Sequence, residues 1–224
     1  MKNYIYFPIS LFIFLMSCNQ NDNQTKIILE TTGFADSTKI YLTDLEKETT
    51  DSGYIINNNL VYSVEIDEPT QFSIRPVIKT RADIDVKSFW KENKLLTIRA
   101  EKGNLKNARV EGSEIQIQAD AVDANKTHLR QINDSLMKVY RSLPEEDTEK
   151  RLAVRTKGKE ITQAIKDVEI NYVKNNPDEL FSVITLKQLM TYTIPKDETK
   201  ALYENLNVEM KSTKYGITIK KFWI

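Results

Sequence analysis

Apolar and polar positions alternate with a period of two along the first half of the chain. Leu60, Tyr62, Val64 and Ile66 fall on one face of such a segment, the pattern of a half-buried β-strand. Similar short runs, rich in β-branched and aromatic residues, cover residues 26–30, 39–43, 54–56, 71–75 and 95–99. Three asparagines at 57–59 predict a tight turn, because asparagine tolerates left-handed backbone angles. The spacing predicts a small antiparallel sheet or sandwich over residues 26–112.

At Gly112 and Ser113 the spacing of the apolar residues changes from the period of a strand to that of a helix. Ser113 is a candidate helix N-cap, and Gln116 stands where it would complete a capping box. Apolar residues then recur at steps of three and four, and Pro144 ends the pattern. We expect one face of a long helix to carry Ile115, Ala119, Val122, Leu129, Ile132, Leu136, Val139 and Leu143.

A second helical pattern follows Pro144 and stops at Asn175-Asn176-Pro177. Its apolar positions are Leu152, Ile161, Ile165, Val168 and Tyr172. Gly158 is the residue in this pattern that most disfavours a helix, because glycine has a low helix propensity. Joined by a short loop, the two helices should lie antiparallel and bury these faces on each other. The predicted fold class is α+β, with the β-rich domain (26–112) followed by an α-helical domain (113–224) that contains this helix pair.

Three shorter helices are expected after Pro177. The first begins at Pro177-Asp178-Glu179 and is apolar enough, through Met190, to be buried. Asp197 should cap a second one, which carries Ala201, Leu202 and Leu206, and Lys214 to Ile224 should form a third. The chain ends on Phe222-Trp223-Ile224; such a cluster either packs on the body or contacts a partner, and packing is the preferred interpretation.

The N-terminus carries the most specific motif. Lys2 precedes an apolar stretch from Tyr4 to Met16 that is too short to span a bilayer as a helix. The stretch closes in Leu15-Met16-Ser17-Cys18, a lipobox, and Cys18 is the sole cysteine. We therefore predict a lipoprotein signal peptide (1–17) and lipidation of Cys18, whose acyl chains would hold the protein on a bilayer. The alternatives are an ordinary signal peptide with an incidental cysteine and an uncleaved anchor helix.

A polar tether follows the lipidation site. Residues 18–25 contain Asn19-Gln20-Asn21-Asp22-Asn23-Gln24, with no apolar side chain among them. Asn19 is not the aspartate that favours retention at the inner membrane. We expect an outer-membrane lipoprotein that faces the periplasm.

Composition narrows the function. Lys plus Arg and Asp plus Glu each number 32, so no net field favours a polyanion and nucleic acid is not an expected partner. With Cys18 lipidated, no thiol is left for a disulfide or a redox pair. No cofactor is expected.

Candidate catalytic groups are sparse. His128 is the only histidine, which argues against a metal site or a Ser-His-Asp triad. Asp83 and Asp85, and the run Glu145-Glu146-Asp147, place carboxylates close together, as acid–base catalysis requires, but their polar, turn-like setting favours solvated surface. The aromatic pair Phe89-Trp90 is interpreted as core. We predict no metal site and no enzyme activity.

Several segments in order resemble a known arrangement. They are Lys39-Ile40-Tyr41-Leu42, Asp51-Ser52, Glu68-Pro69, Phe89-Trp90-Lys91-Glu92-Asn93, residues 105–113, residues 172–182 and Lys214-Tyr215-Gly216. Together they resemble the N-terminal domain of unknown function, and the helical segment after it, of Bacteroidota lipoproteins of the TlpA-like thiol-disulfide oxidoreductase group; residues 89–93 and 105–113 correspond to its closing strands. In that group a thioredoxin-like domain with a Trp-Cys-x-x-Cys site comes next. The resemblance implies fold and compartment, and no residue here matches the redox pair.

The expected function is a non-catalytic, membrane-anchored binding or scaffold module. Its partners would be the lipid bilayer, through acylated Cys18, and a periplasmic protein. The alternative is an accessory protein of a thiol-disulfide exchange system that docks a thioredoxin-like domain on a separate chain. A carboxylate hydrolase is the third hypothesis.

Overall fold

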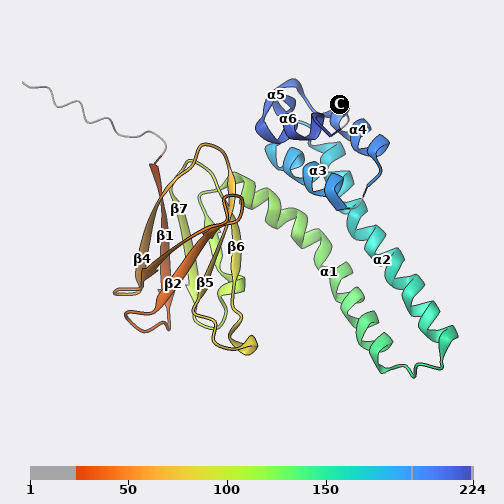
Figure 1. Cartoon of the computed structure of the whole chain (residues 1–224), viewed down its shortest axis with the longest axis horizontal. Helices are drawn as coiled ribbons and strands as arrows, with labels where there is room; N and C mark the ends of the chain where they lie inside the picture. The colour runs from red at the N-terminus through yellow and green to blue at the C-terminus, as the bar shows by residue number, and fades with distance from the viewer. Residues whose placement is uncertain (1–23, 193, 223–224) are drawn as a thin grey trace, which may run out of the picture.

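The computed structural model describes residues 24–192 and 194–222 of the 224-residue chain. Two four-stranded sheets are followed by a helical region in which two long helices pack together (Figure 1). The predicted α+β fold class is confirmed. The strands are β1 (Gln24–Thr32), β2 (Lys39–Asp44), β3 (Thr49–Tyr54), β4 (Asn59–Glu65), β5 (Thr70–Pro76), β6 (Lys87–Lys91), β7 (Leu96–Glu101) and β8 (Arg109–Glu111). The helices are α1 (Glu114–Ser142), α2 (Thr148–Asn175), α3 (Leu180–Tyr192), α4 (Lys196–Asn205), α5 (Val208–Ser212) and α6 (Lys214–Lys220).

The two sheets enclose one apolar core. Their strand orders are β4-β1-β7-β8 and β3-β2-β5-β6, and all neighbouring strands run antiparallel except β1 and β7, which are parallel. Inward-facing side chains of both sheets form a single buried cluster, as in a sandwich. The hydroxyl of Tyr62 on β4 crosses it to donate to the carbonyl of Ile40 on β2 at 2.8 Å.

The turn predicted at the three asparagines is confirmed. Asn57 and Asn58 have φ angles of 50° and 61°, and Ile56 and Asn59 exchange two backbone hydrogen bonds around them. The strand expected at 54–56 is wrong in position, because β3 covers Thr49–Tyr54. β3 is an edge strand whose residues are nearly all exposed, so it lacks the apolar alternation that would have revealed it.

The start of α1 differs from the prediction in one respect. The Ser113 hydroxyl accepts from the backbone N–H of Gln116 at 3.0 Å, which confirms the N-cap. The Gln116 side chain, however, does not complete a capping box. It accepts from the backbone N–H of Trp90 on β6 and donates to Asp120.

The antiparallel pair of α1 and α2 is present (Figure 1). α1 ends at Ser142, directly before Leu143 and Pro144, and α2 continues through Gly158 without a break. Leu152 was placed on the wrong face, since its side chain is 64% exposed. The first turns of α2 contain few apolar residues, so Leu152 alone did not indicate which face of the helix is buried there.

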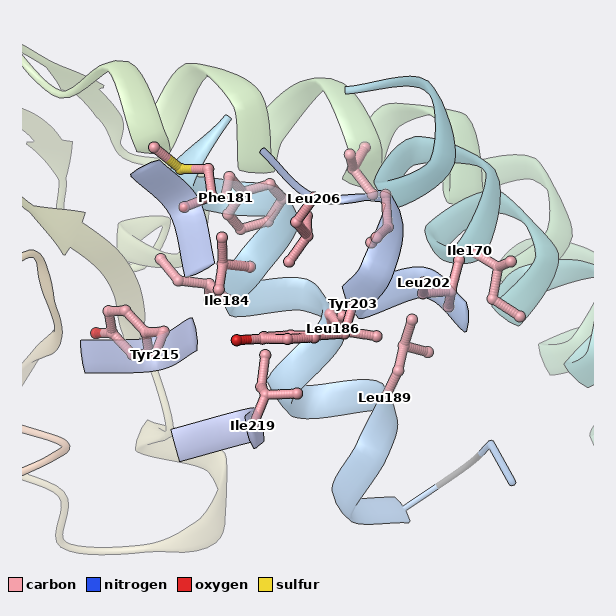
Figure 2. Close-up of a cluster of buried hydrophobic side chains, with 14 of the residues drawn as sticks. Ile170, Phe181, Ile184, Leu186, Leu189, Leu202, Tyr203, Leu206, Tyr215 and Ile219 are labelled. Atoms are coloured by element: carbon pink, nitrogen blue, oxygen red, sulfur yellow. The ribbon is translucent and has the colours of Figure 1, made fainter. Parts of the chain in front are cut away.

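The short helix α3 is buried, as its apolar sequence predicted. Figure 2 shows it running through the helical core, with side chains from α2, α4 and α6 around it. Asp197 lies in the first turn of α4 and is not its N-cap, because the helix begins one residue earlier, after Pro195. α5 was not predicted, and its cap is Asn207, which accepts from the N–H of Met210 at 2.8 Å.

The C-terminal aromatic cluster is described only at Phe222. Its ring is 39% exposed and lies 4.8 Å from the ammonium group of Lys196. Trp223 and Ile224 lie outside the described residues. Among helices within residues 24–192 and 194–222, none is both long and apolar enough to cross a membrane.

A lysine lies inside the sandwich. Lys91 has no exposed surface; its ammonium group donates to the Thr25 hydroxyl at 3.1 Å and to the backbone carbonyls of Glu92 and Lys94. Burial lowers the pKa of Lys91 from 10.5 to about 8, and the nearby Glu92 carboxylate only partly opposes this. The residue links β6 to β1 across the sandwich, and its charge disfavours the folded state.

This burial predicts a pH dependence of stability. Between pH 8 and 10.5 the unfolded chain holds a proton on Lys91 that the folded chain has lost, so stability should rise with pH through this window. Replacing Lys91 by Met removes the effect. The free energy of unfolding of the native protein, measured in urea relative to the Lys91→Met variant, should increase by up to about 3 kcal/mol from pH 7 to pH 10. Parallel stability profiles of the two proteins would contradict the assignment.

Candidate functional site

The predicted lipidation site cannot be placed. Cys18 and the predicted signal peptide lie outside the described residues, and Gln24 and Thr25, the last residues of the predicted tether, already belong to β1. His128 lies exposed on α1. Within the described part of the chain, no group of three or more His, Cys, Asp or Glu side chains is placed to hold a metal ion.

Three of the carboxylates singled out in the sequence satisfy backbone N–H groups. Asp83 accepts from the backbone N–H and the hydroxyl of Thr80, which hold the pKa of its carboxyl below the ordinary value. Asp85 accepts from two successive N–H groups at 105 and 106, and Asp147 caps α2. Glu145 and Glu146 are exposed in the loop before α2. These contacts stabilise turns and a helix end.

The junction of the sandwich and the helices is built on β6. Phe89 points into the sandwich and stacks on Phe72 at 6.1 Å, whereas the next residue, Trp90, points the other way and meets Phe181 of α3 at 6.4 Å. The Trp90 backbone N–H donates to Gln116 of α1 at 2.8 Å. The Glu92 carboxylate accepts from the N–H of Glu114 at the start of α1. β6 therefore contributes one side chain to each core, and it also holds the start of α1 by hydrogen bonds.

A second contact joins the sandwich to the last helix. The hydroxyl of Tyr215 on α6 donates toward the Glu46 carboxylate at 2.8 Å and the Pro69 carbonyl at 2.6 Å. Burial, with the adjacent Glu46, raises the pKa of Tyr215 above its ordinary value. Lys214 adds an exposed ion pair to Glu46. The junction is thus closed by hydrogen bonds at both ends of the helical domain.

The hydrogen bond from Trp90 to Gln116 can be tested by substitution. Gln116→Leu keeps the side-chain size but leaves a buried backbone N–H without an acceptor, and we expect a loss of about 1–3 kcal/mol in the free energy of unfolding. Urea denaturation measures it. The matched control is Gln131→Leu, on an exposed position of the same helix, which should change stability little. Equal effects of the two substitutions would show that the Trp90 contact adds nothing.

The far half of the helix pair leaves the body of the protein. The buried residues of α1 end at Lys126, and those of α2 begin at Ile161. Residues 127–160, here called the distal hairpin, extend beyond both cores (Figure 1). At its base the ammonium group of Lys126 bonds Glu169 of α2 at 2.7 Å. The distal hairpin is therefore a two-helix arm held to the body at one end.

The tip of the distal hairpin is held in a defined shape. The guanidinium of Arg151 lies 4.2 Å from the ring centre of Tyr140 and donates to the carbonyl of Leu143 at 2.9 Å. Lys150 pairs with Asp147, the cap of α2. These contacts fix how α2 returns along α1 at the tip.

A groove of about 800 Å³ runs between α1 and α2 along this arm and continues beyond residue 160 as far as Lys166. Its apolar lining comes from both helices and consists of Leu136, Met137, Tyr140 and Val154. Gly158 also lines it, and a Cβ built there would meet only the Asn133 side-chain oxygen, at 3.9 Å. The missing side chain widens the groove at its middle.

The charged residues lining the groove are all basic. Arg155, Lys159 and Lys166 face it, and no carboxylate does. None of the three is ion-paired within residues 24–192 and 194–222. The groove thus combines an apolar lining with a row of cations, a combination that suits an amphipathic ligand of negative charge.

Comparisons with known proteins identify no family. No model of a protein family matches the chain, and a search of curated proteins finds no match. The resemblance to TlpA-like lipoproteins therefore stays a prediction.

Sequence reasoning missed this groove. The signal was present in the spacing of Arg155, Lys159 and Lys166, which lie four and seven residues apart on α2 and so share a face. Charged residues along a long helix ordinarily indicate a solvated outer face. The sequence pattern shows which positions are apolar or charged, but not that no third helix covers them.

Proposed function

We propose that the protein is a non-catalytic scaffold lipoprotein, anchored through acylated Cys18 to the outer membrane and facing the periplasm, whose distal hairpin binds a protein partner. The observation that carries the proposal is the arm itself: two long helices that leave both cores and, among the described residues, pack only on each other, with an unfilled groove between them. Helix pairs with an apolar groove are a common means of binding a partner helix.

The placement of the chain ends agrees with this role. β1 and α1 begin at the same end of the molecule, and the tip of the distal hairpin lies at the opposite end (Figure 1). Six residues from Cys18 to Asn23 span at most about 20 Å even when extended, and a helix of 29 residues is about 43 Å long. An anchored protein would therefore hold the tip away from the bilayer, where a soluble partner can reach it.

The proposed non-catalytic role draws on how the carboxylates are used in the fold. Asp83, Asp85 and Asp147 each accept hydrogen bonds from backbone N–H groups, and their geometry serves the fold. Asp83 and Asp85 line a second hollow, of about 490 Å³, but both oxygens of Asp85 and one of Asp83 already accept hydrogen bonds from the backbone. The groove of the distal hairpin is lined by no carboxylate.

Substitution of Cys18 tests the anchor. Cys18→Ala should move the protein from the membrane pellet to the soluble fraction, because the acyl chains hold the protein on the bilayer and contribute nothing to the core. Circular dichroism and resistance to proteolysis should be unchanged. Asn21→Ala, in the tether, is the control that keeps the thiol. If the Cys18→Ala protein still pellets with membranes, the apolar segment itself is the anchor.

A further inference from the structure

We infer that the groove of the distal hairpin takes an acidic amphipathic α-helix of a partner protein, which lies along α1 and α2 and completes a three-helix bundle. The inference deepens the proposed scaffold function, on which it rests, by naming the chemistry of the partner. It depends on three properties of the groove: its apolar lining, its row of cations and its position in the molecule.

The apolar lining suits one helical face. Leu136, Met137 and Tyr140 come from α1 and Val154 from α2, so a third helix laid in the groove would contact both walls with its own apolar stripe. Met137 is 42% exposed, which leaves apolar surface for a partner to cover. At Gly158 the backbone of α2 is open to close approach by a side chain of the incoming helix.

The cations specify the charge of the partner. Arg155, Lys159 and Lys166 lie along one face of α2 over a length of about 16 Å. Other lysines on the same helix have acidic partners, since Lys150 pairs with Asp147 and Lys157 with Glu160 at 2.8 Å. A partner helix with carboxylates at matching intervals would pair with the three groove cations while its apolar stripe covers Leu136 and Val154.

Two other occupants fit less well. A second copy of this chain would bring the same three cations against themselves, because a two-fold interface places the same patch on both sides. An anionic membrane would be attracted by the charge, but the distal hairpin extends away from the end of the molecule where β1 begins (Figure 1), and the proposed anchor would hold that end nearest the bilayer. The combination of a concave apolar lining and a short row of cations favours a helix over a flat lipid surface.

The probe for the test is a synthetic helical peptide of about 18 residues with leucines on one face and glutamates flanking them. A second peptide carries lysine in place of each glutamate. Each is labelled with a fluorophore and titrated, by fluorescence anisotropy, against the full-length lipidated protein in detergent. The acidic peptide should bind and the basic peptide should not.

Reversing the charge of groove residues should shift binding from the acidic peptide to the basic peptide. Lys159→Glu should weaken binding of the acidic peptide about tenfold or more, and Arg155→Glu with Lys159→Glu should allow the basic peptide to bind. The matched control is Lys157→Glu, the same change on the same helix but outside the groove lining, and it should leave the affinity for the acidic peptide nearly unchanged.

A steric pair of variants tests the groove without changing charge. Gly158→Leu places a side chain in the groove and should abolish binding of the acidic peptide, whereas Gly158→Ala, whose Cβ meets nothing closer than 3.9 Å, should bind normally. Circular dichroism confirms that both variants keep their helices. If Gly158→Leu binds as well as Gly158→Ala, the peptide does not lie in the groove and the inference is overturned.

Three further outcomes would also overturn the inference. They are failure of the acidic peptide to bind, equal binding of both peptides, and binding to phosphatidylglycerol vesicles that is lost in Lys159→Glu, which would assign the groove to lipid. The anchor is tested separately by fractionation of Cys18→Ala. Loss of peptide binding with intact membrane attachment contradicts only the groove assignment, and the reverse result contradicts only the anchor.

Discussion

The structure depends on the closing of one sheet edge by one helix. β6 is the edge strand of its sheet, and an unpaired edge exposes N–H groups that would otherwise bind another strand. Here the Trp90 N–H is bonded by Gln116, and the Glu92 carboxylate accepts from the first N–H groups of α1. The same few atoms therefore close the sandwich, cap the positive end of α1 and set the direction in which α1 leaves.

The distal hairpin follows from that constraint. Because Ile115 and Val122 are buried in the helical core, the first turns of α1 cannot rotate independently of the body. α2 is held in the same way at its far end by Ile170 and Val173. A regular α-helix transmits this orientation along its whole length, so two helices anchored at one end project as a single arm. Its groove is thus placed by contacts that lie well outside it.

Sequence periodicity predicted the elements that have a strong apolar face and missed those that lack one. Most of the strands, the helix pair and the buried helix α3 were predictable, whereas β3 is polar and α5 is a single turn. Gln116 shows a different limit. Its position after Ser113 fits a capping box, yet the side chain bonds a strand 26 residues away, because satisfying a buried N–H outweighs a local exposed contact. The parallel pairing of β1 and β7 joins distant segments and has no local signature.

Sequence periodicity also did not reveal the groove, because it shows which helix positions are apolar but not whether the fold covers them. An apolar face on a long helix is ordinarily interpreted as covered by the rest of the fold, yet Leu136 and Met137 are covered only in part, and Val154 likewise. A helix pair of this length does not need Gly158 for its backbone, since α2 is regular there and glycine costs about 1 kcal/mol against alanine in a helix. Its effect is to leave the groove open beside three cations that form no ion pair with any residue the structure describes. Both features weaken the arm on its own and favour its association with an acidic helix.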